Sequence, residues 1–456
     1  MKFKSCYSCL LFPLFFICIA CSKEEPVNNT EKPILRLDVR EKLVTNASGI
    51  FNIAVTSNKV WNIENQSNWL KPDLVQGKGN ASIIIRYDAN TTEKRVGVIR
   101  FTAEGINPVE LIVTQTELTF TNPIGGIPDP WIIKYNSGYY ICKASGNGIN
   151  ISRSNKLSVI SPTKSVWKCP VDVGTNKPWN VTNVWAPELH RIDGRWYVYY
   201  AAGRPHDETN SYQFQRSGVL RAKTDDPMGE WEDMGLLYTG DNYQPGIVPT
   251  NLNTNYAIDL GVFKLNGQLY AVWSGYPTGS SDQKLYIAKM SDPYTISSSR
   301  SVISSADKYW EVYNSKINEG PAFLKNRNQG KFFVIYSCNG SWTKQYRLGY
   351  IMLKDTLADP TKSINWSKSS TDVFYRCDNT SSSDGVNGVG HCSFTKSLDD
   401  SEDWIVYHVK NRNDDSWSSG RSTFIQKFVW KADGTPDFGT PVGWGEPVPL
   451  PSGESR

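Results

Sequence analysis

One strand pattern recurs five times in this 456-residue chain, and it restricts the possible folds more than any other feature of the sequence. Each copy is a short run of aromatic and β-branched residues, apolar at nearly every position, as expected for a strand buried on both faces. The copies are 139–142 (Tyr-Tyr-Ile-Cys), 196–200 (Trp-Tyr-Val-Tyr-Tyr), 269–273 (Leu-Tyr-Ala-Val-Trp), 332–336 (Phe-Phe-Val-Ile-Tyr) and 404–407 (Trp-Ile-Val-Tyr). Several strands fit between successive copies, so the repetition predicts a five-bladed β-propeller around a central channel. A large irregular β-sandwich would account for the strands but not for their repetition.

The segment 34–117 has a different texture, with short strands in which apolar and polar residues alternate. Turn residues separate these strands at close spacing, which is typical of a small, immunoglobulin-like β-sandwich. The clearest strands are 51–55, 81–87, 97–101 and 109–113. The whole chain is therefore predicted to be all-β, with an N-terminal sandwich domain at 34–117 followed by the propeller at 118–456.

Two motifs give the sandwich a family resemblance. The segments 67–70 (Ser-Asn-Trp-Leu) and 95–99 (Arg-Val-Gly-Val-Ile) stand in the order found in BACON domains, which 34–117 resembles along its length. We expect Trp61 and Trp69 to pack in the core rather than to stack on sugars. The resemblance implies a spacer or a weak glycan binder without catalytic residues.

The N-terminus has the form of a targeting signal. Lys2 and Lys4 precede an apolar run, 10–20, that is too short to span a bilayer as a mature helix. The run ends in Cys-Ile-Ala-Cys, which resembles the lipobox of bacterial lipoproteins, in which the final cysteine, here Cys21, is acylated. An ordinary secretory signal is the alternative interpretation.

The domain organisation follows from this signal. We predict a lipoprotein signal peptide at 1–20 and a polar tether at 21–33, because two prolines and several charges follow the cysteine. The segment 22–26 (Ser-Lys-Glu-Glu-Pro) resembles the surface-export signal of Bacteroidota lipoproteins. It implies a membrane partner: a protein anchored by lipid to the outer membrane at the cell surface, with the periplasmic face as the alternative.

Charge and cysteine usage exclude two classes of function. The formal net charge of +4 is too small to favour nucleic acid as a partner. Beyond the signal region the cysteines lack the spacing of a metal site and allow at most two disulfides. These cysteines are Cys142, Cys169, Cys338, Cys377 and Cys392.

Three acidic residues stand where successive repeats begin. Asp129 lies in Gly-Ile-Pro-Asp-Pro-Trp, Asp259 in Ala-Ile-Asp-Leu-Gly-Val, and Glu319 in Asn-Glu-Gly-Pro-Ala-Phe. Equivalent positions of propeller blades converge on the axis, so we expect the three carboxyl groups to share one pocket. Glycoside hydrolysis needs two carboxyl groups in different protonation states, and a third acid nearby raises the pKa of the proton donor. A lone Asp-Pro is more often a turn, but three such acids on a five-fold repeat favour catalysis.

With these motifs, residues 119–453 resemble glycoside hydrolase family 43. The resemblance implies that Asp129 is the general base, Glu319 the general acid and Asp259 the residue that tunes the pKa of the acid. It also implies inversion of the anomeric configuration, for which base and acid stand roughly 6.5–9.5 Å apart to admit a water molecule.

The same resemblance suggests substrate-binding residues. Trp185 and Glu188 lie in a Trp-Ala-Pro-Glu-Leu-His segment, in which Trp185 would line the sugar pocket or pack, and Glu188 would have a structural or supporting role. Arg421, together with His408, resembles the late substrate-recognition segment, with a structural ion pair as the alternative. His391 resembles a histidine under the active site that touches a water or a calcium ion. No cofactor is required, and the resemblance allows a structural calcium at the propeller axis with His391 nearby, although calcium prefers oxygen ligands.

The predicted substrate is a plant-type polysaccharide or oligosaccharide. The Trp-Ala-Pro-Glu-Leu-His segment, the strand 196–200 and the segment 436–441 look like the α-L-arabinofuranosidase branch, which acts on arabinan or arabinoxylan. A β-xylosidase, a β-galactofuranosidase or an endo-arabinanase would share the catalytic residues. A non-catalytic glycan-binding lipoprotein and a protein-interaction propeller are alternatives from other classes, and neither needs three inward acids.

The lipid anchor is tested at Cys21. Cys21→Ala should abolish acylation and release the protein from membranes, because the acyl chains provide the burial energy of the anchor. Incorporation of labelled palmitate measures this directly, and equal labelling of the mutant would contradict the assignment.

Overall fold

The computed structural model shows a nearly all-β protein with two compact units that divide at Thr116 and Glu117. Its only helical segments among the described residues are three short 3-10 turns, η1 (Ser211–Phe214), η2 (Tyr309–Glu311) and η3 (Ser363–Asn365). The described residues are 32–204, 211–277, 279–379, 382–415 and 420–455. Cys21 and the predicted signal peptide lie outside them. Within these ranges no helix is both long and apolar enough to cross a membrane.

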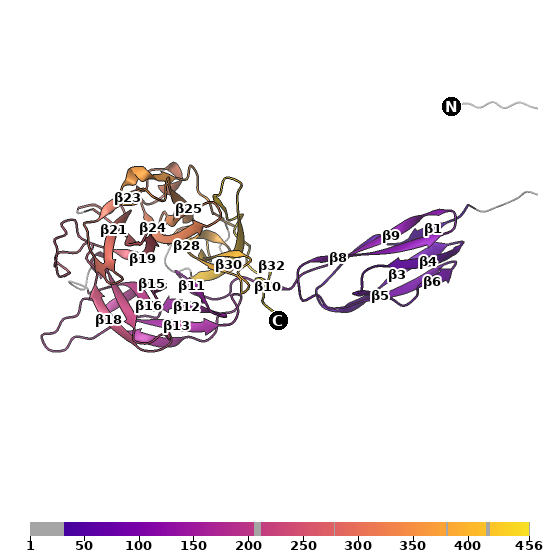
Figure 1. The fold of residues 1–456 in the computed structure, drawn as a ribbon, viewed down its shortest axis with the longest axis horizontal. Coiled ribbons are helices and arrows are strands. Elements are labelled where there is room, and N and C mark those ends of the chain that lie inside the picture. Colours follow the sequence, from indigo (N-terminus) through magenta and orange to yellow (C-terminus); the bar gives the residue numbers. More distant parts are fainter. Residues whose placement is uncertain (1–31, 205–210, 278, 380–381, 416–419, 456) are drawn as a thin grey trace, which may run out of the picture. The chain divides into compact units, whose positions relative to one another are not determined.

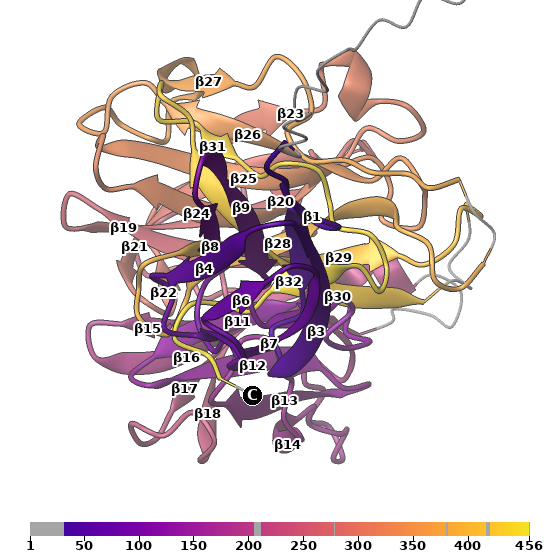
Figure 2. The same ribbon diagram turned by 90° about the vertical axis from the view of Figure 1, so that its right-hand side faces the viewer.

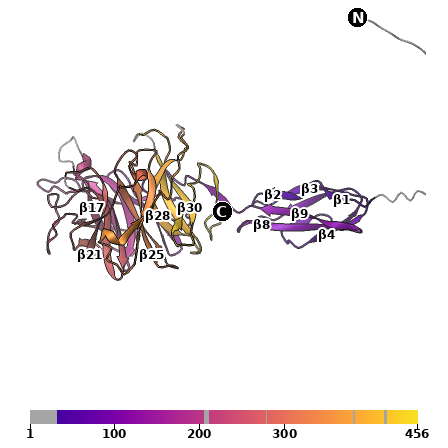
Figure 3. The same ribbon diagram turned by 90° about the horizontal axis from the view of Figure 1, so that it is seen from above.

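The N-terminal unit is a sandwich of two sheets, seen edge on in Figure 3. One sheet has the order β1-β3-β7-β5 and the other β2-β9-β8-β4-β6. The strands are β1 (Leu35–Leu37), β2 (Glu41–Val44), β3 (Gly49–Ser57), β4 (Val60–Asn65), β5 (Leu70–Pro72), β6 (Gln76–Lys78), β7 (Ala81–Tyr87), β8 (Arg95–Ala103) and β9 (Ile106–Gln115). Inward residues of both sheets meet in one core, and both Trp61 and Trp69 are buried in it, as expected from the sequence.

The second unit is a ring of five antiparallel sheets, which confirms the predicted five-bladed propeller. Figure 1 looks onto this ring, with the first strand of each blade toward the centre, and Figure 2 shows the outer strands β14, β18 and β27 at its periphery. The first two blades are β11 (Trp131–Tyr135), β12 (Gly138–Ala144), β13 (Gly148–Ser154), β14 (Lys164–Lys168), and β15 (Thr182–Ile192), β16 (Arg195–Gly203), β17 (Arg216–Ala222), β18 (Trp231–Leu236). The third is β19 (Ile258–Leu265), β20 (Gln268–Gly275), β21 (Lys284–Asp292), β22 (Thr295–Ile296) and β23 (Ser301–Ser305). The last two are β24 (Asn318–Asn326), β25 (Lys331–Cys338), β26 (Arg347–Leu353), β27 (Trp366–Lys368), and β28 (Asn387–Lys396), β29 (Asp403–Lys410), β30 (Arg421–Trp430), β31 (Pro436–Asp437).

The recurring apolar run of the sequence is the second strand of every blade. Because side chains alternate along a strand, each of these strands contributes to two layers between blades. In β20, Ala271 and Trp273 pack against the second blade, whereas Tyr270 and Val272 pack against the fourth. A strand that is covered on both sides has no polar face, which explains the unbroken apolar pattern.

The two ends of the propeller unit close the ring. Strand β10 (Thr119–Thr121) pairs with β32 (Pro447–Pro449), and both belong to the layer between the first and fifth blades. The buried Asn122 adds two hydrogen bonds: its amide nitrogen donates to the carbonyl of Ile425 at 2.9 Å, and its amide oxygen accepts from the Ile425 N–H at 3.0 Å. The first residues of the unit thereby complete the last blade.

The innermost strands share a local distortion. In the second to fifth blades the pairing of the first strand with the second is interrupted by a register shift near one end. Each interruption contains one residue with a left-handed backbone, and an equivalent residue precedes the first blade. The φ angles are 49° at Asp129, 40° at Ala186, 55° at Asp259, 57° at Gly320 and 45° at His391. A β-bulge re-aims the side chains beside it, and here the second to fifth blades each contain one, while in the first blade the left-handed Asp129 precedes β11.

Candidate active site

The left-handed positions bring the three predicted acids to one end of the propeller channel. Asp129 and Asp259 occupy such positions themselves, and Glu319 directly precedes Gly320. The N–H of Gly320 donates to Oδ2 of Asp259 at 3.0 Å. An added Cβ at Gly320 would lie 3.2 Å from Cγ of His391, so only glycine allows this close approach between the fourth and fifth blades.

Asp129 lies among three nitrogen-bearing side chains. Its Oδ1 accepts from Nη1 of Arg421 at 2.8 Å and lies 3.3 Å from Nδ1 of His391 and 3.2 Å from Nδ1 of His408. Burial opposes ionisation, but Arg421 and the two histidines together hold the pKa of Asp129 well below its usual value. The carboxyl group is therefore ionised near neutral pH, as a proton acceptor must be.

His408 fixes the backbone of this acid. The N–H of Asp129 donates to Nδ1 of His408 at 3.1 Å. Burial lowers the pKa of His408 to about 4, so the ring is neutral near pH 7. The ring lies parallel to that of Tyr346, with centroids 5.5 Å apart and an interplanar angle of 7°.

Glu319 has the opposite electrostatic environment. Its side chain is buried, and Oε1 accepts a hydrogen bond from the Tyr346 hydroxyl at 2.9 Å. Burial raises the pKa of Glu319, and the negative charge of Asp129 raises it further, while Tyr346 and Arg421 lower it in part. The net pKa lies above the usual value for glutamate, so Glu319 keeps a proton at a pH where Asp129 has lost its own.

Asp259 acts on the backbone beside Glu319. Burial raises the pKa of Asp259, and the charges of Glu319 and Asp129 raise it too, whereas His391 and the amide of Gly320 lower it. Its contact to Gly320 fixes the residue that follows Glu319. The three acids thus form one coupled group in which one carboxyl is held ionised and two are held toward the protonated form.

Comparison with known proteins identifies the family. The family model for "Glycosyl hydrolases family 43" matches residues 120–436, which is more than half of the chain. The chain belongs to glycoside hydrolase family 43. The model of the BACON domain, described as an N-terminal binding domain, matches residues 59–116, so both predicted resemblances are confirmed.

Several relatives of this family 43 chain have named activities. An extracellular exo-α-(1→5)-L-arabinofuranosidase of Streptomyces avermitilis is 35% identical over 342 residues, which is 72% of this chain and 65% of the relative. An α-L-arabinofuranosidase B of Pyricularia oryzae is 32% identical over 340 residues, which is 71% of this chain and 64% of the relative. The chain therefore spans just under two-thirds of these curated relatives. The crystal structure of an α-L-arabinofuranosidase from Lactobacillus brevis matches with a TM-score of 0.62 and 30% identity, covering 72% of this chain and 98% of that one.

The structure places the other predicted residues of this family 43 site as follows. Arg421 and His391 both contact Asp129, whereas Trp185 packs partly buried against Ala201, Tyr256 and Ile258. Within the described ranges no group of three or more His, Cys, Asp or Glu side chains could hold a metal ion. His391 and the cationic Arg421 contact the same carboxylate oxygen of Asp129, which is not the oxygen-rich set that calcium requires.

Two contributors were not assigned these roles from the sequence. Tyr346 precedes the third strand of the fourth blade and is one of 23 tyrosines, without a motif around it. Ser337 accepts a hydrogen bond from the N–H of His391 at 2.7 Å and so supports the left-handed backbone there. Ser337 lies in β25 and Tyr346 lies just before β26, so neither belongs to the innermost strands that carry the acids. Their surroundings in the sequence do not indicate a polar contact.

A fourth buried acid, Glu188, lies further along the channel. Glu188 follows the left-handed Ala186 by two residues, its Oε2 lies 2.8 Å from Nε2 of His190, and its carboxyl group covers Gly261. Burial raises the pKa of Glu188 to about 8, although His391 lowers it, and burial lowers the pKa of His190 to about 3. Near neutral pH both groups are therefore uncharged.

Beyond this pair the channel has an apolar lining. All five blades contribute to a cavity of about 200 Å³, and its lining residues are Trp131, His190, Val262, Phe263, Ala322, Phe323 and Phe394. The apolar surroundings account for the uncharged state of Glu188 and His190, because a charge there would be poorly solvated. The structure thus supports a structural position for Glu188, apart from the three acids at the mouth.

Glu188 should make the stability of the protein depend on pH. Its pKa is higher in the folded than in the unfolded state, so its contribution is complete below the unfolded pKa and is lost as pH rises toward 8. Between pH 5 and pH 8 the wild type should lose on the order of 3 kcal/mol of unfolding free energy relative to Glu188→Gln, which cannot ionise. Denaturant unfolding at both pH values measures this, with the exposed Glu230→Gln as control. A wild type and a Glu188→Gln protein with parallel pH profiles would contradict the buried protonated state.

Proposed function

We propose that this chain is an inverting α-L-arabinofuranosidase that removes arabinofuranosyl residues from arabinan or arabinoxylan. The observation that carries the proposal is the difference between the partners of Asp129 and Glu319. Arg421 bonds to Asp129 and lowers its pKa, whereas the buried Glu319 accepts from the Tyr346 hydroxyl and has a raised pKa. An ionised and a protonated carboxyl group side by side are the requirement for hydrolysis of a glycosidic bond. The named activities of the relatives support arabinofuranose as the sugar.

The reaction follows from the two protonation states. Glu319 donates its proton to the glycosidic oxygen as the bond from the anomeric carbon to that oxygen breaks. Asp129 takes a proton from a water molecule, whose oxygen bonds to the anomeric carbon from the opposite face. The products are the sugar with inverted configuration and the free alcohol, and proton exchange with solvent restores both acids. Arg421 keeps Asp129 ionised beforehand, and Asp259 holds the amide that follows Glu319.

The sugar assignment is tested with a substrate panel. Aryl α-L-arabinofuranoside, aryl β-xyloside and aryl β-galactofuranoside present the same leaving group with different sugars. We expect the arabinofuranoside to be cleaved with the highest kcat/KM. Preference for the xyloside or the galactofuranoside would change the assigned sugar but not the mechanism. If none of the three glycosides is cleaved, a glycan-binding role is favoured.

Substitution of the two carboxyl groups should separate their roles. Glu319→Gln should lower kcat/KM by roughly 10²–10⁴-fold for substrates with poor leaving groups and much less for activated aryl glycosides, which need little protonation. Asp129→Asn should lower kcat/KM by a similar factor for both kinds of substrate, because each reaction needs an activated water. Proton NMR in the first minutes should show the inverted anomer. Initial formation of the retained anomer would contradict the single-displacement mechanism.

Removal of the Tyr346 hydroxyl should alter the pH profile. That hydroxyl stabilises the ionised form of Glu319 and lowers its pKa, so Tyr346→Phe should raise this pKa. The proton donor then stays protonated to higher pH, and the alkaline limb of kcat/KM should move to higher pH. The maximal rate should fall by no more than about tenfold, the value of one hydrogen bond. Tyr350→Phe, in the same blade, is the control, and an alkaline limb that stays in place or moves to lower pH would contradict the assignment.

For the location, we propose that acylation of Cys21 holds the enzyme at the outer membrane, with its substrate on the outside. The proposal is supported by the lipobox resemblance of the sequence. The BACON domain would then serve as a spacer or weak glycan binder between the anchor and the catalytic unit.

A further inference from the structure

Two tyrosines of the third blade form a stacked pair at the active-site end of the propeller. Tyr256 lies two residues before β19, and Tyr276 directly follows β20. Ile258 pairs with Ser274 in antiparallel register, so the residues two positions beyond, Tyr256 and Tyr276, come opposite each other. Their rings are 4.1 Å apart with an interplanar angle of 12°. Tyr256 comes shortly before Asp259, which lies at the start of β19.

The segment that carries Tyr276 is tied to the segment that carries Glu319. The Ser274 hydroxyl donates to the carbonyl of Asn318 at 2.8 Å. Further along, the N–H of Asn318 donates to the carbonyl of Gln283 at 3.1 Å. The chain between β20 and β21 thus runs beside the residues that lead into Glu319. The pKa of Tyr256 agrees with this placement, since burial and the charges of Tyr276, Glu319 and Asp259 raise it well above its usual value.

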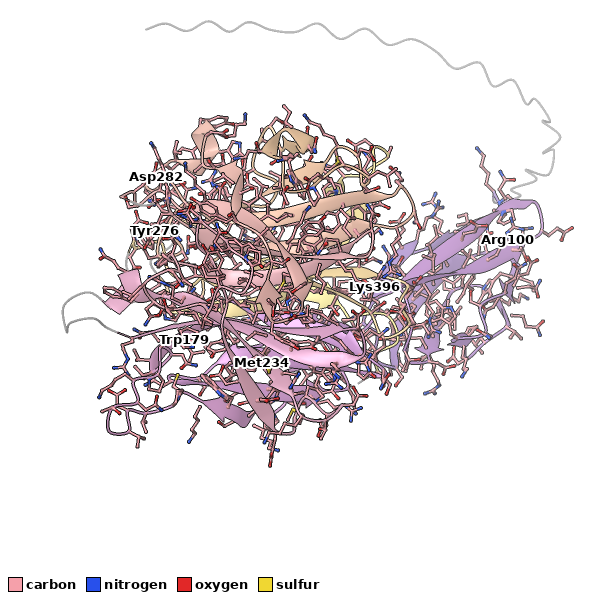
Figure 4. The ribbon with its side chains drawn as sticks, turned by 60° about the vertical axis from the view of Figure 1, so that its left-hand side comes forward. Arg100, Trp179, Met234, Tyr276, Asp282 and Lys396 are labelled. Carbon is pink, nitrogen blue, oxygen red and sulfur yellow. The ribbon has the colours of Figure 1, made fainter. Side chains whose placement is uncertain are left out.

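The outer ring of the pair remains accessible. Tyr256 is buried, whereas Tyr276 is half-buried, and Figure 4 shows Tyr276 at the same edge of the propeller unit as Asp282. Tyr276 is also held in place, because its carbonyl accepts from Nη1 of Arg300 at 3.3 Å and Arg300 pairs with Asp241 at 2.6 Å. A fixed, partly exposed aromatic face stacks well on the C–H face of a sugar ring at little entropic cost.

We propose that Tyr276, supported from behind by Tyr256, binds the sugar unit on the leaving-group side of the scissile bond. A general acid must lie on the side of the oxygen that it protonates. The segment that carries Tyr276 is bonded to Asn318, the residue before Glu319, so the Tyr276 ring faces the sugar that departs with that oxygen. The ligand class is the adjoining sugar of an oligosaccharide or polysaccharide. The inference rests on the proposed role of Glu319 as the acid, and it adds that the enzyme recognises a saccharide leaving group.

The test compares a substrate with a leaving-group sugar and one without. α-1,5-L-arabinobiose carries the sugar, whereas α-L-arabinofuranosyl fluoride loses only fluoride. In the full chain, Tyr276→Ala should lower kcat/KM for the disaccharide about tenfold more than for the fluoride, as expected for the loss of one stacking contact. Tyr276→Phe keeps the stacking ring and removes only its hydroxyl, so it should retain most of the activity on the disaccharide that Tyr276→Ala loses. Circular dichroism and a thermal melt check that each variant is folded.

The outcomes separate this inference from the proposed function. Equal losses with both substrates, or no loss with either, would overturn the leaving-group site. A wild type that cleaves neither arabinosyl compound would overturn the sugar assignment, and the same comparison with β-1,4-xylobiose and β-D-xylosyl fluoride then decides whether Tyr276 contacts the leaving group. A wild type that is inactive on both pairs would overturn both proposals.

Discussion

The left-handed backbone at the start of each blade is the constraint on which the active site depends. A regular inner strand would send alternate side chains into the layers between blades, and the bulge turns selected ones toward the channel instead. Asp and His tolerate positive φ better than most residues, but each such residue still costs about 1 kcal/mol or more. Asp129, Asp259 and His391 all adopt this backbone, and the surrounding sheets hold it in place. The fold thus stores strain where the acids converge.

Charge placement then divides the roles of otherwise similar acids. Asp129 and Glu319 are both withdrawn from water, and burial alone would raise the pKa of each. Arg421 bonds directly to Asp129, while the carboxyl group of Glu319 accepts a hydrogen bond from the Tyr346 hydroxyl. The cation therefore reverses the effect of burial at one acid and only moderates it at the other. Asp259, with a single backbone N–H as its donor, follows Glu319 rather than Asp129.

The sequence predicted those parts of the structure that produce a repeated or a local pattern of residues. The doubly covered second strands form an apolar repeat, from which the five blades follow, and the acids interrupt apolar or Gly-Pro segments at equivalent places. The direction of each pKa could not be predicted, because it depends on partners from distant segments such as Tyr346 and Arg421. The position of Glu188 could not be predicted either, because in the sequence Glu188 resembles the three acids at the other blades. The bulge in β15 shows that its side chain points deeper into the channel. The stacking of Tyr276 on Tyr256 depends on the antiparallel register of β19 and β20, which the sequence does not show.

The closure of the ring has a consequence for how the catalytic unit is made. The hydrogen bonds between Asn122 and Ile425 join residues 303 positions apart, and β10 finds its partner only in β32, close to the C-terminus. Such contacts form late in folding, because closing so long a loop costs conformational entropy before the contacts can stabilise the fold. Until β32 is available, the apolar layer between the first and fifth blades lacks part of its cover. A nascent or truncated chain that lacks β32 therefore exposes apolar surface, and its solubility depends on the segment that carries β32.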